Sequence, residues 1–177
     1  MPRPLIFNSS PLIYLAKVSL ATWLKEIPQE KFTTSKVFKE VVQEGKEGGS
    51  PEASLIENLF NEGTIQVRNP NDPEYLRSVE KVCAESERHP LHKAEAQVLC
   101  LAKELGGMAI ADDRVARSVA RLLKIELHGT GYILGKIFAT GKVKKEELTE
   151  KAKEMRHQGW YVSAEDYIEI IQYLNSL

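Results

Sequence analysis

The sequence predicts an α/β fold in which a mostly parallel central sheet is sandwiched between helices. Short apolar runs recur along the 177 residues and alternate with longer stretches in which apolar residues follow helical spacing. The run 108–111 contains no polar residue at all. Strands without polar residues are typical of parallel sheets buried on both faces, and regular alternation of strand and helix indicates βαβ units.

The predicted sheet has five short strands, each bounded by polar or turn-forming residues. They span residues 5–7, 32–34, 64–67, 108–111 and 125–128. The first strand is a Leu-Ile-Phe run, the third alternates polar and apolar residues, and the fourth is wholly apolar. These are the patterns of buried or half-buried strands.

Helices are predicted from apolar residues at spacings of three and four and from residues that favour helix ends. Ser9 or Ser10 is expected to cap the first helix. Ser35 is expected to cap the third helix and Gly45 to end it. The predicted helices cover residues 11–16, 20–26, 35–44, 51–61, 74–87, 91–105, 113–124, 146–157 and 164–174, with one more after residue 131.

Composition indicates an ordinary globular protein. Apolar residues make up 42% of the chain and charged residues 28%. No run approaches the length of a membrane span, and the N-terminus lacks the sections of a signal peptide, so a cytoplasmic location is expected. We expect residues 1–145 to form the main domain and residues 146–177 to form a helical extension packed on it.

Charge is unevenly distributed, although the net charge is only −1. Residues 112–145 carry a net charge of +5, and residues 146–177 carry a net charge of −4. A basic block of this kind is compatible with a surface that faces phosphates, and equally with solvated helix faces. Both interpretations remain open at this point.

Several kinds of site are disfavoured by the spacing of their residues. Cys83 and Cys100 form no CxxC or other paired spacing, so we expect them to be small buried residues in a reducing cytosol. His89 and His92 flank a proline and have no thiolate beside them, which argues against zinc. The glycines within residues 129–135 have GxGxxxG spacing instead of that of a dinucleotide-binding fingerprint, and the sequence has no Walker, GxSxG or HExxH pattern.

Polar residues follow two of the predicted strands. Residues 8–10 (Asn-Ser-Ser) follow the first strand, and Asp112 and Asp113 follow the fourth. The carboxyl ends of parallel strands meet at one rim of the sheet, where ligands bind in such folds. Two adjacent carboxylates repel each other and would be stabilised by a cation. Alternatively, either Asp112 or Asp113 is simply the N-cap of the following helix, which explains that residue equally well.

Two further carboxylates lie on predicted helices. Glu95 is in the first turn of a helix whose surrounding face is apolar, where the helix dipole alone stabilises a carboxylate by about 0.3–1 kcal/mol. Glu40 borders an apolar stripe made by Val37 and Val41, but it lies among other charged residues. Taken singly, each glutamate has an ordinary structural explanation.

Read in order, four segments resemble the motifs of PIN domains. Residues 7–13 (FNSSPLI) resemble the opening of such domains, where a strand ends in an acid followed by a small hydroxyl residue. Residues 37–41 (VFKEV) are similar to the second motif, and residues 92–96 (HKAEA) to the third; each places one glutamate on a helix. Residues 111–114 (ADDR), with the His-Gly-Thr at 128–130, resemble the fourth. The likeness is to a branch of PIN-like proteins that opens with Asn-Ser-Ser-Pro-Leu-Ile, or with Asp in place of the Asn, and ends in a helical tail.

This resemblance implies a Rossmann-like, three-layer PIN fold and a metal-dependent ribonuclease. Hard Mg²⁺ or Mn²⁺ ions prefer oxygen ligands. The metal ligands implied by the resemblance come from all four segments: Asn8, Glu40, Glu95, Asp112 and Asp113. Glu40, Glu95 and Asp112 are the implied catalytic carboxylates.

The resemblance also implies how substrate would be held. Ser9 and Thr130 would orient a ligand or a water molecule, and Arg114 and Arg117 would contact phosphates. The implied partners are RNA, an antitoxin protein if the chain acts like VapC-type toxins of toxin–antitoxin pairs, and a second copy of the chain in a homodimer.

The chain departs from the family pattern at Asn8, which stands where the family has its first acid. An amide oxygen can bind a metal ion but adds no negative charge. This leaves two alternatives to the ribonuclease. One is a catalytically impaired PIN-like domain that binds RNA or protein. The other is a different Rossmann-like enzyme such as a phosphatase, for which the DxD pair expected after the first strand is missing.

Overall fold

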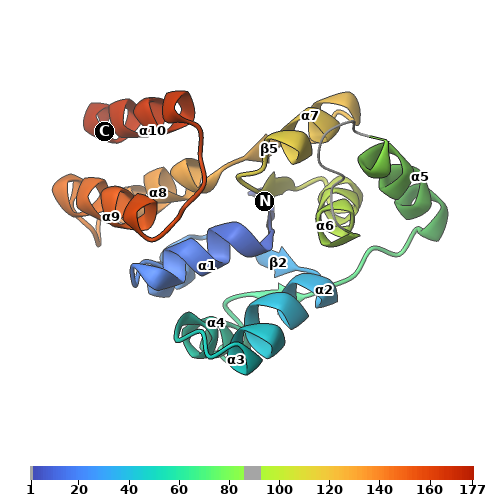
Figure 1. Cartoon of the computed structure of the whole chain (residues 1–177), viewed down its shortest axis with the longest axis horizontal. Coiled ribbons are helices and arrows are strands. Elements are labelled where there is room, and N and C mark those ends of the chain that lie inside the picture. The colour runs from blue at the N-terminus through green and yellow to red at the C-terminus, as the bar shows by residue number, and fades with distance from the viewer. Residues whose placement is uncertain (1, 86–92) are drawn as a thin grey trace.

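A parallel sheet of five strands forms the centre of the molecule in the computed structural model, which describes residues 2–85 and 93–177 (Figure 1). The strands are β1 (Leu5–Phe7), β2 (Lys31–Thr33), β3 (Gln66–Val67), β4 (Met108–Ile110) and β5 (Leu127–His128). Their order is β3-β2-β1-β4-β5, and every neighbouring pair is parallel. The central strands β1 and β4 are wholly buried. The predicted α/β class with a parallel sheet is confirmed.

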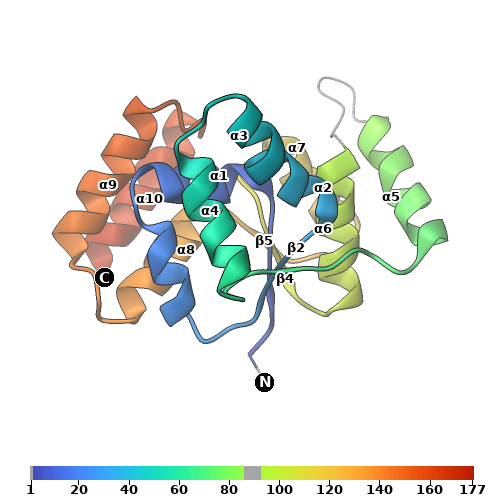
Figure 2. The same cartoon turned by 90° about the horizontal axis from the view of Figure 1, so that it is seen from below.

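Helices cover both faces of this sheet. The α-helices are α1 (Ser9–Lys17), α2 (Ser35–Phe38), α3 (Gly45–Glu47), α4 (Glu52–Asn61), α5 (Pro73–Ala84), α6 (Lys93–Glu104), α7 (Arg114–Leu122), α8 (Thr130–Ala139), α9 (Lys145–His157) and α10 (Ala164–Ser176). A 3₁₀ helix, η1 (Ala21–Glu26), and a π-helix, η2 (Lys39–Glu44), complete the set in the described ranges. Helices α1, α4 and α8 lie on one side of the sheet, and α5 and α6 lie on the other (Figure 2). Among the described helices, none has the length and apolar character that a membrane crossing needs.

The last two helices pack on the same molecule as a pair. Helix α9 contacts α1 and α8, and α10 contacts α8 and α9. A Cβ atom added to Gly131 would lie 2.6 Å from Ile170 Cγ1, and one added to Gly135 would lie 2.1 Å from the Tyr173 hydroxyl. Because these glycines let α10 approach α8 closely, their GxGxxxG spacing has a packing explanation.

The helix predicted between Ser35 and Gly45 begins and ends elsewhere. The Thr34 hydroxyl accepts a hydrogen bond from the Val37 amide (3.5 Å), so Thr34 caps the helix in place of Ser35. The helical chain continues through Gly45 into α3, so the predicted end is wrong. A Cβ atom on Gly45 would lie 3.1 Å from the Ala53 Cβ. Gly45 therefore allows close packing against α4 while it keeps helical geometry.

Both cysteines are buried, as the sequence predicts. Burial raises the pKa of Cys83 to about 11 and that of Cys100 to about 12, with smaller contributions from nearby acidic groups. Only the thiolate reacts with disulfide reagents. We expect both thiols of the folded protein to react with such a reagent at pH 8 at least about a hundredfold more slowly than in denaturant. Stopped-flow measurements with and without guanidinium test this, and fast modification of the folded protein would contradict it.

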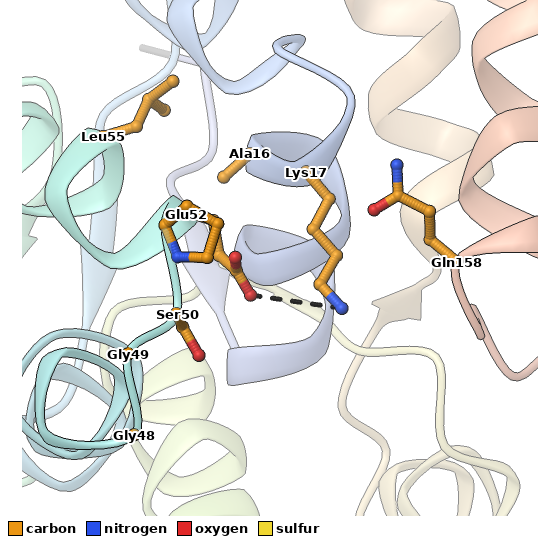
Figure 3. A pocket seen from close by; sticks show the side chains of 9 residues that line it. Ala16, Lys17, Gly48, Gly49, Ser50, Glu52, Leu55 and Gln158 are labelled. Carbon is orange, nitrogen blue, oxygen red and sulfur yellow. Dashed lines mark ion pairs between the residues drawn. The ribbon is translucent and has the colours of Figure 1, made fainter.

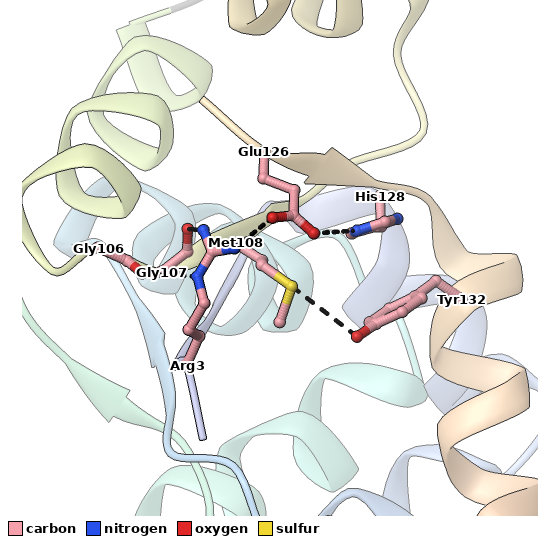
Figure 4. Close-up of polar contacts among 7 residues, drawn as sticks. All are labelled: Arg3, Gly106, Gly107, Met108, Glu126, His128 and Tyr132. Atoms are coloured by element: carbon pink, nitrogen blue, oxygen red, sulfur yellow. Dashed lines mark hydrogen bonds and ion pairs between the residues drawn. The ribbon is translucent and has the colours of Figure 1, made fainter. Parts of the chain in front are cut away.

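Arg3 ties the N-terminal segment to the starts of β4 and β5 (Figure 4). Its guanidinium donates hydrogen bonds to the carbonyl oxygens of Gly106 and Gly107 (both 2.9 Å) and pairs with Glu126. Glu126 also contacts His128 Nε2 at 2.8 Å. Hydrogen bonds from His128 and Arg3 hold the pKa of the Glu126 carboxyl below its usual range. This cluster fixes the two strands whose far ends carry candidate site residues.

Candidate active site

A pocket of about 420 Å³ lies at the carboxyl edge of the sheet, and residues from five separate segments line it. Asn8 follows β1, Glu40 lies in η2, Glu95 lies in the first turn of α6, and Asp112 follows β4. Ser9, Asp113 and Arg114 line the same pocket, whereas Arg117 and Thr130 do not. Because β1 and β4 are neighbours in the sheet, Asn8 and Asp112 lie at the same place on its edge. Helical segments bring Glu40 and Glu95 to the same pocket.

Asp112 is the most firmly held carboxylate of the pocket. The Thr130 amide donates to Asp112 Oδ1 (2.7 Å), and the Thr130 hydroxyl donates to Asp112 Oδ2 (2.7 Å). The indole of Trp160 also donates to Oδ2 (2.9 Å). A Cβ atom on Gly129 would lie 3.0 Å from Asp112 Oδ1, so a glycine there leaves room for the carboxylate. The Ser10 hydroxyl adds a long hydrogen bond to Oδ2 (3.5 Å). Asp112 thus accepts about as many hydrogen bonds as a carboxylate can, so a metal ion would have to replace one of them.

Asn8 presents an unused acceptor to the pocket. It is the N-cap of α1, but its side chain makes no capping hydrogen bond, in contrast to the caps predicted at Ser9 or Ser10. Asn8 Nδ2 donates to Glu95 Oε1 (3.4 Å). Within the described ranges, the buried oxygen Asn8 Oδ1 has no hydrogen-bond partner. A buried acceptor of this kind is costly unless a ligand or solvent group satisfies it.

Glu40 is held toward the pocket by the start of α1. Ser9 Oγ donates to Glu40 Oε2 at 2.7 Å. Glu40 belongs to the π-helical segment η2, and π-helical turns are frequent at functional sites because they shift side chains out of the α-helical pattern. The serine after Asn8 therefore orients a carboxylate that lies on another element.

The two arginines predicted to meet substrate occupy different positions. Arg114 lines the pocket and forms long ion pairs with Glu165 (3.7 Å) and Asp166 (4.0 Å). Arg117 pairs with Asp166 (3.3 Å) and lines a neighbouring pocket between α8 and α10. Asp113 caps α7 by accepting from the Ala116 amide at 2.8 Å, so the capping interpretation holds for this residue.

Sequence reasoning missed the contribution of the connection between α9 and α10. Trp160 is only 2% exposed and binds Asp112, and Tyr161 is 91% exposed and lines the pocket. The Tyr14 hydroxyl donates to the Gly159 carbonyl (2.8 Å) and holds the same connection against α1. Two adjacent aromatic residues in a short polar connection were the only signal in the sequence.

Lys36 and Lys39 were also missed. They line a second depression of about 410 Å³ together with Glu40, Glu44 and Glu95, so the two depressions share two carboxylates. In the sequence these lysines resemble any other charged residues on a helix surface. Only the fold shows that they flank the candidate carboxylates.

The carboxylates do not form a compact metal cluster in this conformation. Across residues 2–85 and 93–177, no three His, Cys, Asp or Glu side chains are grouped so as to hold one metal ion. Asn8 donates a hydrogen bond to Glu95, Ser9 donates one to Glu40, and Trp160 donates one to Asp112. His92 of the third segment lies outside the described residues.

A larger pocket, of about 540 Å³, lies elsewhere and contains none of the predicted site residues (Figure 3). It lies between α1, the 48–51 loop and Gln158, and the ion pair between Lys17 and Glu52 (4.0 Å) lies across it. Apart from this ion pair, the described residues that line it bring together no group of acids or nucleophiles. The sequence-predicted carboxylates line the smaller pocket at the sheet edge instead.

The bond between Trp160 and Asp112 makes a prediction about stability. Replacing Trp160 with phenylalanine removes the indole donor and keeps most of the apolar volume, so the free energy of unfolding is expected to fall by about 1.5–3 kcal/mol. Tyr14→Phe is the matched control, because it removes a neutral hydrogen bond that holds the same connection and should cost about 0.5–1.5 kcal/mol. Urea denaturation measures both. An equal loss for the two variants would contradict a special role for the charged acceptor.

Comparisons with known proteins concern the family and the fold. A family model described as a PIN domain matches residues 4–176. Endoribonuclease Nob1 of Pyrococcus abyssi is 30% identical over 107 residues, which are 60% of this chain and 62% of Nob1. The chain therefore covers less than two thirds of that relative. The crystal structure of PAE2754 from Pyrobaculum aerophilum has a TM-score of 0.52 at 18% identity and covers 78% of this chain and 99% of that one. This second likeness concerns the fold alone.

Proposed function

The chain belongs to the PIN-domain family, and we propose that it is an endoribonuclease that depends on Mg²⁺ or Mn²⁺. The observation that carries this proposal is the pocket at the carboxyl edge of the sheet, where Asn8, Glu40, Glu95 and Asp112 meet from four segments. Oxygen donors gathered from several segments at this edge suit a hard cation, which in turn would attract a phosphodiester. The likeness to an endoribonuclease supports RNA as the substrate.

The donor set fits a hard divalent ion in its chemistry. All of the proposed ligands present oxygen: Asn8, Glu40, Glu95 and Asp112, with Asp113 adjacent. The buried Asn8 Oδ1, which lacks a hydrogen-bond partner among the residues described, is available to such an ion. When bound, the ion would activate a water molecule and neutralise charge on the scissile phosphate.

The remaining residues are proposed to position these acids and the substrate. Ser9 holds Glu40, and Thr130 holds Asp112. Arg114 is the proposed phosphate contact inside the pocket, because exposed ion pairs such as those with Glu165 and Asp166 are weak and can exchange for a phosphate. Lys36 and Lys39 extend the positive charge on the other side of Glu40 and Glu95. Arg117, paired with Asp166, is proposed to reach substrate only if that pair opens.

The decisive experiment is a Mn²⁺ titration followed by an RNA cleavage assay on the same preparation. Calorimetry is expected to show Mn²⁺ binding, and cleavage of a mixed-sequence RNA is expected to need the metal and to stop when a chelator is added. Contamination is controlled by a parallel preparation of the Glu40→Gln variant, which should cleave far more slowly. A protein that neither binds Mn²⁺ nor cleaves RNA at millimolar metal would sink the proposal.

A second candidate is a PIN domain that binds RNA without cleaving it. Two observations favour it: Asn8 replaces an acid, and each oxygen of Asp112 already accepts a hydrogen bond. Both features weaken the attraction for a cation. RNA binding with no cleavage over a full range of Mn²⁺ and Mg²⁺ concentrations would select this candidate.

The finer parts of the proposal concern partners and organisation. We propose a cytoplasmic protein that forms a homodimer and is inhibited by an antitoxin protein, with residues 146–177 belonging to the same folding unit as residues 1–145. Light scattering measures whether the chain forms a homodimer. Co-expression with the product of a neighbouring small reading frame tests whether an antitoxin inhibits it. A monomer that no neighbouring product inhibits would remove both partners and leave the nuclease proposal standing.

A further inference from the structure

The connection between α9 and α10 places two aromatic side chains on opposite sides. Trp160 points inward, is 2% exposed and donates to Asp112 Oδ2 (2.9 Å). Tyr161 follows directly, is 91% exposed and lines the pocket that holds the four candidate metal ligands. Residues 160–163 lie in neither a helix nor a strand, and this connection buries one aromatic side chain while it leaves the next one in solvent.

The position of Tyr161 is fixed by contacts on both sides of it. On one side, the Tyr14 hydroxyl donates a hydrogen bond to the Gly159 carbonyl (2.8 Å). On the other side, Ser163 caps α10 by accepting from the Asp166 amide (3.0 Å). The Tyr161 ring is thus carried by a backbone that is held in place, although the ring itself makes almost no contact.

An exposed aromatic ring beside a phosphate-binding site has a specific use in nucleic-acid recognition. Unpaired bases stack on aromatic side chains, and this contact tolerates any base because each has a flat face. In a duplex, both faces of a base are already covered by its neighbours. Arg114 lines the same pocket and can hold a phosphate near the ring.

We propose that Tyr161 is a stacking platform for an unpaired base next to the phosphate held in this pocket, and so a residue that sets how tightly the site holds a single strand. This inference rests on the proposed function, because it needs an RNA phosphate at the carboxylates. It assigns two roles to the C-terminal connection. Trp160 positions Asp112, and Tyr161 holds an unpaired base beside the phosphate.

The test compares binding of single-stranded and duplex RNA oligomers of one sequence by fluorescence anisotropy, with Ca²⁺ in place of Mn²⁺ to slow cleavage. Tyr161→Ala is expected to weaken single-strand binding by about five- to a hundredfold, the range for loss of one stacked base, and to leave duplex binding within twofold. Tyr161→Phe keeps the ring and should stay within about threefold of the original protein. Leu122→Ala is the matched control, since Leu122 is 75% exposed on α7 and does not line the pocket.

A second readout separates stacking from any general disturbance. A 2-aminopurine base placed along the oligomer should be quenched on binding to the original protein and not on binding to Tyr161→Ala. All four proteins should share one melting temperature. Unchanged single-strand affinity in Tyr161→Ala, or equal weakening for both RNA forms, overturns the inference while the proposed function survives. If the original protein binds neither RNA form, the proposed function fails first and the inference with it.

Discussion

Replacing Asp112 with asparagine is expected to lower metal-dependent RNA cleavage by more than about a hundredfold. Loss of a residue that merely supports a metal ligand already costs about 10–100-fold, and Asp112 is proposed as a ligand itself. The variant removes a negative charge from the centre of the pocket, where Thr130 and Trp160 hold the carboxylate in one orientation. Single-turnover cleavage at saturating Mn²⁺ measures the effect.

The same variant is expected to be less stable, which must be separated from its effect on cleavage. Four donor groups converge on Asp112, from Ser10, Thr130 (two) and Trp160, and an asparagine amide has only one oxygen with which to accept them. At least one donor then faces the amide NH₂ group, at a cost of about 1–3 kcal/mol. Asp72→Asn is the matched control, because Asp72 caps α5 away from the pocket and asparagine caps equally well. If folded Asp112→Asn cleaves RNA at the original rate, Asp112 is a structural residue and the ligand assignment is wrong.

The sequence predicted the parts of this site that depend on sheet topology. Apolar runs at the positions of β1 and β4 identified two buried parallel strands, and the rule that ligands bind at the carboxyl edge placed Asn8 and Asp112 at one rim. The structure lines one pocket with both. The positions of Glu40 and Glu95 came from the family resemblance, since periodicity alone left each as an ordinary helix residue.

The parts that could not be predicted depend on contacts between distant segments. Trp160 reaches Asp112 across 48 positions, and nothing in the local sequence of either residue specifies the other. The family resemblance implies that Arg117 contacts phosphates, and its pairing with Asp166 of α10 could not be predicted from either segment. Gly45 was expected to end a helix because isolated glycines often do, whereas the approach of Ala53 explains it. Propensity describes a residue in its own segment, and these outcomes are set by packing between segments.

Asn8→Asp is expected to lower the melting temperature of the protein in the absence of metal and to raise it when Mn²⁺ is bound. Asn8 Nδ2 now donates to Glu95 Oε1 at 3.4 Å. An aspartate there removes the donor and places a second negative charge beside Glu95, so the variant should melt at a lower temperature than the original protein in chelator. The backbone should be unaffected, because the backbone amide of Asn8 keeps its bond to the Ile110 carbonyl (2.9 Å) and the two side chains have nearly the same shape.

In the presence of Mn²⁺ the Asn8→Asp variant should instead melt at a higher temperature than the original protein. A full negative charge about 4 Å from a cation is worth roughly 1 kcal/mol per unit charge in water and about 4 kcal/mol near a protein surface. Since Mn²⁺ carries two unit charges, the Asn8→Asp variant is expected to bind it at least about thirtyfold more tightly, and its melting temperature should rise more steeply with metal concentration. Asn8→Ala, which removes the oxygen altogether, should bind Mn²⁺ more weakly than the original protein.

Asn61→Asp adds the same charge at the exposed end of α4, outside the pocket, and controls for net charge. Calorimetry gives the affinities directly. If Asn8→Asp and Asn61→Asp bind Mn²⁺ equally well, Asn8 is a turn residue only, and the metal must be sought among the acids without it.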